Sequence, residues 1–247
     1  MPPCFTTKIF FDSINIPILL SEAKEVEYPV VPLCMAMQQH VAPRIIKFND
    51  FVGKPAKVHN SIIAGCGQSV PLTRAYLGRG MKEIHQKHFV EQQNTDETTK
   101  TATETYVDDC AQGTSHKKID VLIKGLMCAF RDFRKFSVLK LLLKLSDKGD
   151  VVSSSDEITK AIRLEVLHTL GEKYHGSKSS RDLGISFTAG RTRPSNLFNK
   201  RIKANSSRIE KTVTISCICR SGRKLFSGSC FAANTWGHQA CGFSIST

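Results

Sequence analysis

Residues 106–109 read Tyr106-Val107-Asp108-Asp109, and the interpretation of the whole chain starts from this stretch. Two strand-forming residues followed by two adjacent carboxylates are typical of the tip of a β-hairpin. Carboxylates at such a tip can hold divalent ions, which activate a hydroxyl group and neutralise a leaving pyrophosphate in nucleotidyl transfer. Mg²⁺, or Mn²⁺ in its place, is the expected cofactor, because Mg²⁺ prefers carboxylate oxygens together with substrate phosphates. An Asp-Asp pair taken alone is usually a turn, so the surrounding sequence has to decide.

Three helices are predicted around this stretch. The first follows Gly67 and places near one face Leu72, Tyr76, Met81, Ile84 and His88. The second follows the hairpin and is the clearest amphipathic pattern, with apolar residues Ile119, Leu122, Ile123, Leu126, Phe130 and Phe133. The third runs through Leu170 and opens on a capping-box pattern formed by Ser154 and Glu157. A further helical region, residues 21–40, is interrupted at Pro29 and Pro32.

Short strands are predicted between these helices. The segments are Lys8 to Ile14, a run of short strands and turns from Phe48 to Ile63, a piece around Val151 and Val152, and the alternating Leu183, Ile185 and Phe187. Residues 92–105 are predicted to be an exposed, poorly ordered loop, because the apolar pattern vanishes where threonines accumulate. Strands mixed with helices in this order predict an α+β fold.

The charge of the chain indicates a polyanionic partner. It has 35 Lys and Arg against 22 Asp and Glu, a formal net charge of +13 and a pI of about 9.4. Nucleic acid is the first partner that such a bias favours, and an acidic membrane surface is the second. Arg191 to Lys224 contains ten basic residues and one acidic residue, Glu210. The hydrophobic fraction of 40% is enough for a folded core.

The cysteines and the first residues bear on the compartment. Nine cysteines without a small-scaffold spacing, and a beginning without the layout of a signal peptide, indicate reduced thiols in a nuclear or cytoplasmic setting rather than a secreted protein. The best candidate for a membrane span, Val138 to Leu145, is short and is broken by Lys140 and Lys144. No membrane partner is therefore expected.

The Tyr-Val-Asp-Asp stretch resembles the active-site hairpin of reverse transcriptases, and other segments resemble parts of that family in the same order. Gly65-Cys66-Gly67-Gln68-Ser69-Val70-Pro71-Leu72 is similar to the family's Gly-x-x-x-Ser-Pro-x-Leu segment, with the proline one place late and Ala64 at the usual glutamine position. Ser146-Asp147-Lys148-Gly149-Asp150 is similar to the family's lysine-bearing palm loop. Asp182-Leu183-Gly184-Ile185 is similar to the Leu-Gly hairpin at the primer end. Trp236-Gly237-His238 is similar to an aromatic-Gly patch after the thumb.

The resemblance implies a fold and a function. Residues 1–190 would form a polymerase palm, a short antiparallel sheet backed by helices, and residues 191–247 a basic, helical thumb-like region. The palm would be N-terminally incomplete, because the family's fingers elements have no room before the first strand. The implied activity is RNA-directed DNA synthesis of the kind encoded by non-LTR retroelements, with an RNA template, a DNA primer and dNTPs as partners.

The resemblance also implies residue roles. Asp108 and Asp109 would be catalytic and would bind metal, with Asp12 as a candidate for a further metal carboxylate. Substrate would be held by Phe11 at the sugar 2′ position, Gly65 and Ser69 at the template base and nucleotide, and Lys148 at the phosphates.

One departure from the family concerns the first palm strand. The family has a metal-binding aspartate six places before the position of Asp12, but this chain has Thr6 there, and no acidic residue precedes Asp12. Losing one metal carboxylate removes charge that compensates the ions and the triphosphate, so activity should fall severely. Two functions remain open, which are DNA synthesis by an incomplete polymerase and nucleic-acid binding by a catalytically inactive fragment.

Other groups of residues give weaker predictions of a functional site. Cys217-x-Cys219 with His238-x-x-Cys241 could supply four zinc ligands, which leaves a zinc-stabilised binding module as a third interpretation. His85 and His88 lie one helical turn apart without a nearby carboxylate, and we interpret them as part of a basic helix face. No serine or cysteine has a local nucleophile signature, and the glycines around Cys66 lack the Gly-Lys-Ser/Thr ending of a phosphate loop.

Overall fold

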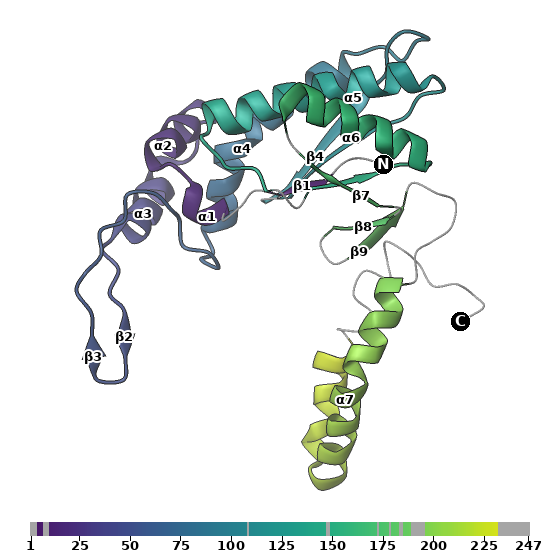
Figure 1. The fold of residues 1–247 in the computed structure, drawn as a ribbon. Helices are drawn as coiled ribbons and strands as arrows, with labels where there is room; N and C mark the ends of the chain where they lie inside the picture. Colours follow the sequence, from purple (N-terminus) through teal and green to yellow (C-terminus); the bar gives the residue numbers. More distant parts are fainter. Residues whose placement is uncertain are drawn as a thin grey trace. The chain divides into compact units, whose positions relative to one another are not determined.

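The computed structural model describes residues 4–6, 10–107, 109–146, 149–171, 173–177, 179–182, 185–188 and 196–231. The chain divides into two compact units. Unit 1 consists of Met1–Val151 and Lys160–His175, and unit 2 of Val152–Thr159 and Gly176–Thr247. The fold is mixed α+β, as predicted, with helices and small antiparallel sheets (Figure 1).

A five-stranded sheet organises the chain around the Tyr-Val-Asp-Asp stretch. Its strands lie in the order β4 (Thr101–Tyr106), β5 (Asp109–Thr114), β1 (Cys4–Thr6), β6 (Asp150–Val152) and β7 (His175–Ser177). The pairs β4–β5, β5–β1 and β1–β6 are antiparallel. With helix α4 (Ser69–His85) before β4 and helix α5 (Ile119–Arg134) after β5, the chain follows the β-α-β-β-α-β order of the split βαβ arrangement. This order places β1 directly beside β5.

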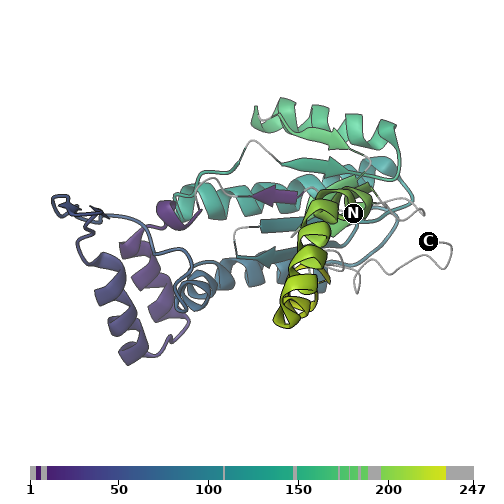
Figure 2. The same cartoon turned by 90° about the horizontal axis from the view of Figure 1, so that it is seen from below.

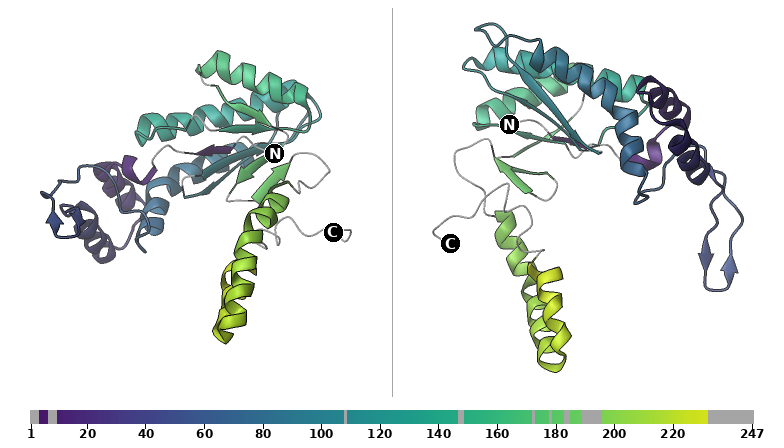
Figure 3. Two further views of the ribbon diagram at one scale, coloured as in Figure 1. Left: turned by 60° about the horizontal axis from the view of Figure 1, so that its bottom comes forward. Right: turned by 180° about the vertical axis from the view of Figure 1, so that it is seen from behind.

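Helices α4 and α5 pack on the same face of the β4–β5 hairpin. The strand register pairs Thr103 with Gln112, so that both side chains point to one face. Gln112 Nε2 donates hydrogen bonds to Ala129 O on α5 (3.2 Å) and to Thr103 Oγ1 (3.2 Å). His85 Nδ1 on α4 lies 3.2 Å from Thr103 O and 3.3 Å from Thr103 N. The helices run alongside the sheet in both views of Figure 3.

Both helices agree with the predictions from apolar spacing. The core includes the predicted face of α4 with Leu72, Tyr76, Met81 and Ile84, and from α5 Leu126, Phe130 and Phe133. The strand at Val151 and Val152 is confirmed as well, and both residues are buried. Gly125 allows α5 to approach the strands, because a Cβ atom there would lie 2.4 Å from Thr99 Cγ2.

The predicted strand from Lys8 to Ile14 is wrong where the structure describes it. Phe10–Ser13 forms the short helix α1, and β1 lies earlier, at Cys4–Thr6. A strand would place residues 10, 12 and 14 on one face. Phe10 and Ile14 are buried whereas Asp12 between them is exposed, and this pattern suits a helical turn.

The predicted loop at residues 92–105 is wrong over its last part, because β4 begins at Thr101. Threonine is a good strand former, and its hydroxyl can be buried when it is hydrogen-bonded. Thr99, Thr101 and Thr103 are all buried, and of the three only the Thr101 hydroxyl has no hydrogen-bond partner among the described residues. Thr99 Oγ1 lies 3.1 Å from Thr114 Oγ1 and donates to Ser115 O (3.0 Å). The polar composition therefore concealed a strand that packs under α5.

Two helices precede the small hairpin of strands β2 (Lys47–Phe48) and β3 (Phe51–Val52). They are α2 (Ile16–Glu25) and α3 (Val30–Val41), and the chain breaks between them at Pro29 as predicted. The predicted interruption at Pro32 is wrong, because Pro32 lies in the first turn of α3, where a helix tolerates proline. Glu22 fastens α2 to α4, since its carboxylate lies 3.0 Å from both Arg79 Nη2 and Lys140 Nζ. Burial raises the pKa of Glu22, but the bonds from Arg79 and Lys140 outweigh burial and lower it overall.

Tyr76 joins the start of α2 to the end of the π-helical turn η2 (Lys135–Lys140). Its hydroxyl donates to Leu141 O (2.6 Å) and accepts from the Asn15 N–H (3.4 Å). Burial raises the pKa of Tyr76 to about 12. A second π-helical turn, η1 (Gln86–Val90), extends α4. The predicted third helix is α6 (Asp156–Leu170), but its cap is Ser155, whose Oγ accepts from Ile158 N (3.2 Å).

Unit 2 contains a two-stranded hairpin and a helical hairpin. The strands are β8 (Ser179–Asp182) and β9 (Ile185–Thr188), and the helical segments are α7 (Asn196–Ile218), η3 (Arg220–Gly222), α8 (Arg223–Leu225) and η4 (Phe226–Phe231). Thr212 Oγ1 of α7 lies 3.3 Å from Cys230 Sγ of η4 in the buried contact between them. The long helix α7 is the yellow-green helix of Figure 2. No helix in the described part of the chain is long and apolar enough to cross a membrane.

Candidate functional site

The Tyr-Val-Asp-Asp stretch forms a tight hairpin. Tyr106 pairs with Asp109, so that the connection between β4 and β5 is two residues long. Two-residue hairpin turns require positive φ, and Val107 has φ 56°. A β-branched residue rarely adopts this conformation, and such strain concentrates at functional sites. Asp108 lies outside the described residues.

Asp109 lies on the face of the hairpin that points away from α4 and α5. The register pairs Tyr106 with Asp109 and Glu104 with Ala111, and these pairs alternate with the Thr103–Gln112 pair that faces the helices. Asp109 and Ala111 are half-buried and Glu104 is exposed.

Strand β1 places Thr6 directly opposite Asp109. The register is Cys4 with Ala111, Phe5 with Cys110 and Thr6 with Asp109. The position at which the resemblance predicts a metal-binding aspartate is therefore paired with Asp109 of the hairpin. The residue at that position has no carboxylate, and the acidic residue that the register places on the far side of β1 is Asp150, which pairs with Cys4 and not with Thr6.

Asp12 takes part in a different contact. It is exposed on α1, and its Oδ1 accepts a hydrogen bond from Ser61 Oγ (3.2 Å). Ser61 Oγ in turn accepts from Arg44 Nη2 (3.3 Å). Asp12 therefore joins an Arg44–Ser61–Asp12 network on the segment that leads to Gly65.

The predicted substrate-binding residues Phe11, Gly65 and Ser69 lie around one loop. Ile62 N donates to Phe11 O (2.9 Å), and the Ser69 hydroxyl donates to Ile63 O. Ser69 is buried at the start of α4, so its hydroxyl shapes the loop. Gly65 has φ 81°, which favours glycine, and the space beside its Cα is open. Phe11 is half-buried, and its ring lies edge-on against Phe10, 5.5 Å between centroids.

His40 on α3 holds this loop in place, and the sequence analysis missed it. It is fully buried, and its Nδ1 accepts the Ile63 N–H (2.9 Å). Burial, together with the positive charge of Arg44, lowers the pKa of His40. The side chain is therefore neutral at pH 7, and a protonated Nδ1 could no longer accept. An isolated histidine in an apolar helix carries no sequence signal for this role.

The hydrogen bond that His40 accepts should make the free energy of unfolding fall as pH is lowered. Because the pKa of His40 in the folded chain is below its ordinary value of 6.5, only the unfolded chain takes up a proton as pH falls below that value. The stabilisation is present above pH 6.5 and is lost below it, by up to about 1.4 kcal/mol per pH unit. Urea unfolding at pH 7.5, 6.5 and 5.5 should show this loss. His40→Asn, whose Oδ1 can still accept, should reduce the loss, whereas the same substitution at exposed His59 should leave it unchanged. Equal pH dependence in His40→Asn and the wild type would contradict the role of His40.

The interpretation of His85 and His88 as a basic face without a carboxylate is wrong. His88 Nε2 lies 2.8 Å from Asp132 Oδ2, although the two residues are 44 positions apart. Lys87 Nζ donates to the same oxygen (2.7 Å). Burial raises the pKa of Asp132, but the bonds from Lys87 and His88 outweigh burial and lower it overall. The cluster joins η1 to α5 and is a structural contact.

The described residues do not complete a two-ion site. Within the described ranges, no group of three or more His, Cys, Asp or Glu side chains could hold a metal ion. Beside Asp109 the structure places Thr6, and Asp12 bonds to Ser61. Cys217 and Cys219 are exposed. The other residues of the expected sites lie outside the described residues. They are Asp108, Lys148, Leu183, Gly184, Trp236, Gly237, His238 and Cys241.

Comparison of the sequence with protein-family models and with curated proteins finds no match. Any assignment of function therefore rests on the residues and on the geometry described above.

Proposed function

We propose that this chain is a reverse-transcriptase-like palm with a basic helical segment, and that it binds nucleic acid without completing the metal site that synthesis requires. The observation that carries the proposal is the pairing of Thr6 with Asp109. The palm part is supported by the order β1, α4, β4–β5 hairpin, α5, β6, which matches the order of the motifs in the sequence. Fold resemblance alone does not carry an activity, so the site decides between binding and synthesis.

The electrostatics at position 6 favour binding over synthesis. Divalent ions bind together with a triphosphate only where nearby carboxylates coordinate the ions. A threonine hydroxyl is neutral and cannot replace a carboxylate in that role. Catalytic groups tolerate little displacement, and Asp12 bonds to Ser61 instead.

Charge on the described surface supports nucleic acid as the ligand. Helix α7 carries five basic residues against Glu210, which are Lys200, Arg201, Lys203, Arg208 and Lys211. Basic side chains on one helix neutralise phosphates and release counterions, so binding should weaken steeply with salt. The proposed ligand is an RNA template, alone or annealed to a DNA primer.

DNA synthesis with Mg²⁺ or Mn²⁺ is the second candidate, and the hairpin favours it. Asp109 lies on the face of the hairpin turned away from α4 and α5, immediately after a two-residue connection, and Val107 before it has φ 56°. A polymerase needs carboxylates at such a tip. This candidate requires Asp108 as the principal metal ligand, and another carboxylate in place of residue 6.

Substitution of Asp108 separates the two candidates. The full chain is incubated with an RNA template annealed to a labelled DNA primer, dNTPs and either Mg²⁺ or Mn²⁺, and extension and fluorescence anisotropy are both measured. We expect salt-dependent binding, no extension, and an affinity in Asp108→Ala within about twofold of the wild type, because one acidic residue contributes little to a phosphate-dominated contact.

The matched control is Asp96→Ala, which removes a 90% exposed carboxylate from a loop of unit 1. Extension by the wild type and by Asp96→Ala that disappears in Asp108→Ala would overturn the inactive-binder proposal in favour of synthesis. A wild-type chain that binds neither template nor template–primer would overturn both candidates.

A further inference from the structure

The segment from Arg44 to Lys57, here termed the aromatic hairpin, contains a short two-stranded hairpin that is separate from the five-stranded sheet. Its strands pair Lys47 with Val52 and Phe48 with Phe51, around a two-residue turn at Asn49 and Asp50. Asn49 has φ 50°, which asparagine tolerates in such turns. Figure 3 shows the hairpin extending away from helices α2 and α3.

Two aromatic rings are exposed on the aromatic hairpin. Phe48 is 73% exposed and Phe51 is 72% exposed, although phenylalanine is normally buried. Directly paired residues of antiparallel strands point to the same face with Cβ atoms about 5 Å apart, so the two side chains leave the hairpin on the same face. Exposed apolar surface that is bordered by charge marks an interaction site.

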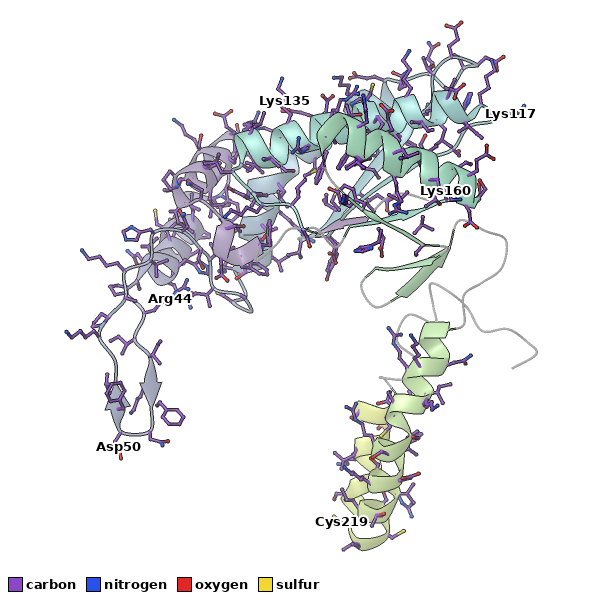
Figure 4. The ribbon with its side chains drawn as sticks, viewed as in Figure 1. Arg44, Asp50, Lys117, Lys135, Lys160 and Cys219 are labelled. Atoms are coloured by element: carbon purple, nitrogen blue, oxygen red, sulfur yellow. The ribbon has the colours of Figure 1, made fainter. Side chains whose placement is uncertain are left out.

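The charges around these rings are mainly positive. The segment has four exposed basic residues, which are Arg44, Lys47, Lys54 and Lys57, against the single acidic residue Asp50 at the turn. None of the four forms a salt bridge with a described residue. Figure 4 shows Arg44 where the segment leaves α3 and Asp50 at its far end.

We infer that the aromatic hairpin binds single-stranded nucleic acid, with bases stacked on Phe48 and Phe51 and with phosphates neutralised by Lys47 and Lys54. Aromatic platforms between basic side chains are the means by which proteins hold single strands, since every base has a stacking face. A duplex hides those faces, and a purely apolar protein partner would not need the surrounding cations. The inference rests on the proposed nucleic-acid binding and locates the single-stranded part of the ligand.

The base of the aromatic hairpin adjoins the candidate site. Arg44 and Ala56 exchange two backbone hydrogen bonds, of 2.9 and 2.8 Å, that close the hairpin stem. Arg44 Nη2 also donates to Ser61 Oγ, which donates to Asp12. A strand held on the hairpin would therefore pass next to the segment that leads to the Gly65 loop.

The test measures binding of the full chain to three probes: a single-stranded RNA 16-mer, a single-stranded DNA 16-mer and a DNA duplex of the same length. Phe48→Leu/Phe51→Leu keeps apolar surface but removes the rings, whereas Phe48→Tyr/Phe51→Tyr keeps the rings. We expect the leucine variant to bind both single strands about tenfold or more weakly, and the tyrosine variant and all duplex binding to stay within about twofold. Lys47→Gln/Lys54→Gln should lower the dependence of log K on log salt by about 0.7 per lost phosphate contact.

The matched control is Val30→Ala/Val31→Ala, which trims side chains 71% and 70% exposed on α3 and should leave binding unchanged. Because both phenylalanines are more than 70% exposed, the leucine variant should keep the wild-type melting temperature. Unchanged single-strand binding in the leucine variant, with duplex binding intact, would overturn the inference alone. Failure of the wild type to bind any probe would overturn the inference together with the proposed function.

Discussion

Thr6→Asp is expected to produce Mn²⁺- or Mg²⁺-dependent primer extension at least about 100-fold above the wild-type rate, because electrostatic stabilisation at a reacting centre has effects of this size. The substitution adds a carboxylate at the position paired with Asp109. Without metal, two like charges directly opposite each other should destabilise the sheet by roughly 0.2–1 kcal/mol. With metal, the same pair becomes a ligand set.

Metal binding by Thr6→Asp can be measured without any activity. At a Mn²⁺ concentration about one hundred times the Kd, binding stabilises the folded state by about 2.7 kcal/mol. For a unit of this size that should raise Tm by about 5–10 °C. Thr6→Asn is the matched control, because it has nearly the same size and no charge, and neither extension nor a Mn²⁺-dependent Tm shift is expected. A folded Thr6→Asp that shows neither effect would mean that residue 6 is not beside a metal-binding hairpin.

Phe130→Ala is expected to destabilise unit 1 by about 3–5 kcal/mol, the usual loss when a fully buried ring leaves a cavity. Phe130 on α5 is 1% exposed. Its ring centroid lies 6.2 Å from that of Phe133 and 6.0 Å from that of Tyr174, which follows α6. Removal of the ring therefore weakens both the helix packing and the attachment of residues 160–175 to α5.

Thermal unfolding followed by circular dichroism should show a fall in Tm of about 6–20 °C for Phe130→Ala. Hydrogen exchange in residues 160–175 should accelerate, since these amides lose part of the packing that protects them. Leu139→Ala is the matched control, because Leu139 is 71% exposed on η2 and its truncation should change stability by less than about 0.5 kcal/mol. A fall in Tm for Phe130→Ala no larger than that for Leu139→Ala would contradict the packing described for α5.

Sequence patterns predicted several individual helices and strands. The spacing of Leu72, Tyr76 and Ile84 predicted α4, because a helix repeats its contacts every three to four residues and apolar spacing records this directly. The Tyr-Val-Asp-Asp stretch predicted a hairpin because two strand-forming residues precede two adjacent aspartates, although Val107 itself does not favour the positive φ of the turn. Strand β4 was partly missed, because Thr101 and Thr103 are polar and their burial depends on partners in β5 and α5.

Contacts between residues far apart in the sequence were decided only by the tertiary structure. The sequence by itself determined that Asp109 follows a hairpin turn and that residue 6 is a threonine. It did not determine that residue 6 lies beside Asp109, that His40 anchors the amide of Ile63, or that Asp132 meets His88. Each of these contacts joins residues more than twenty positions apart, and strand register and helix packing set the distance between them. Periodicity reports only neighbours along one element, and so the chemistry of the candidate site became visible only when separate elements were brought together.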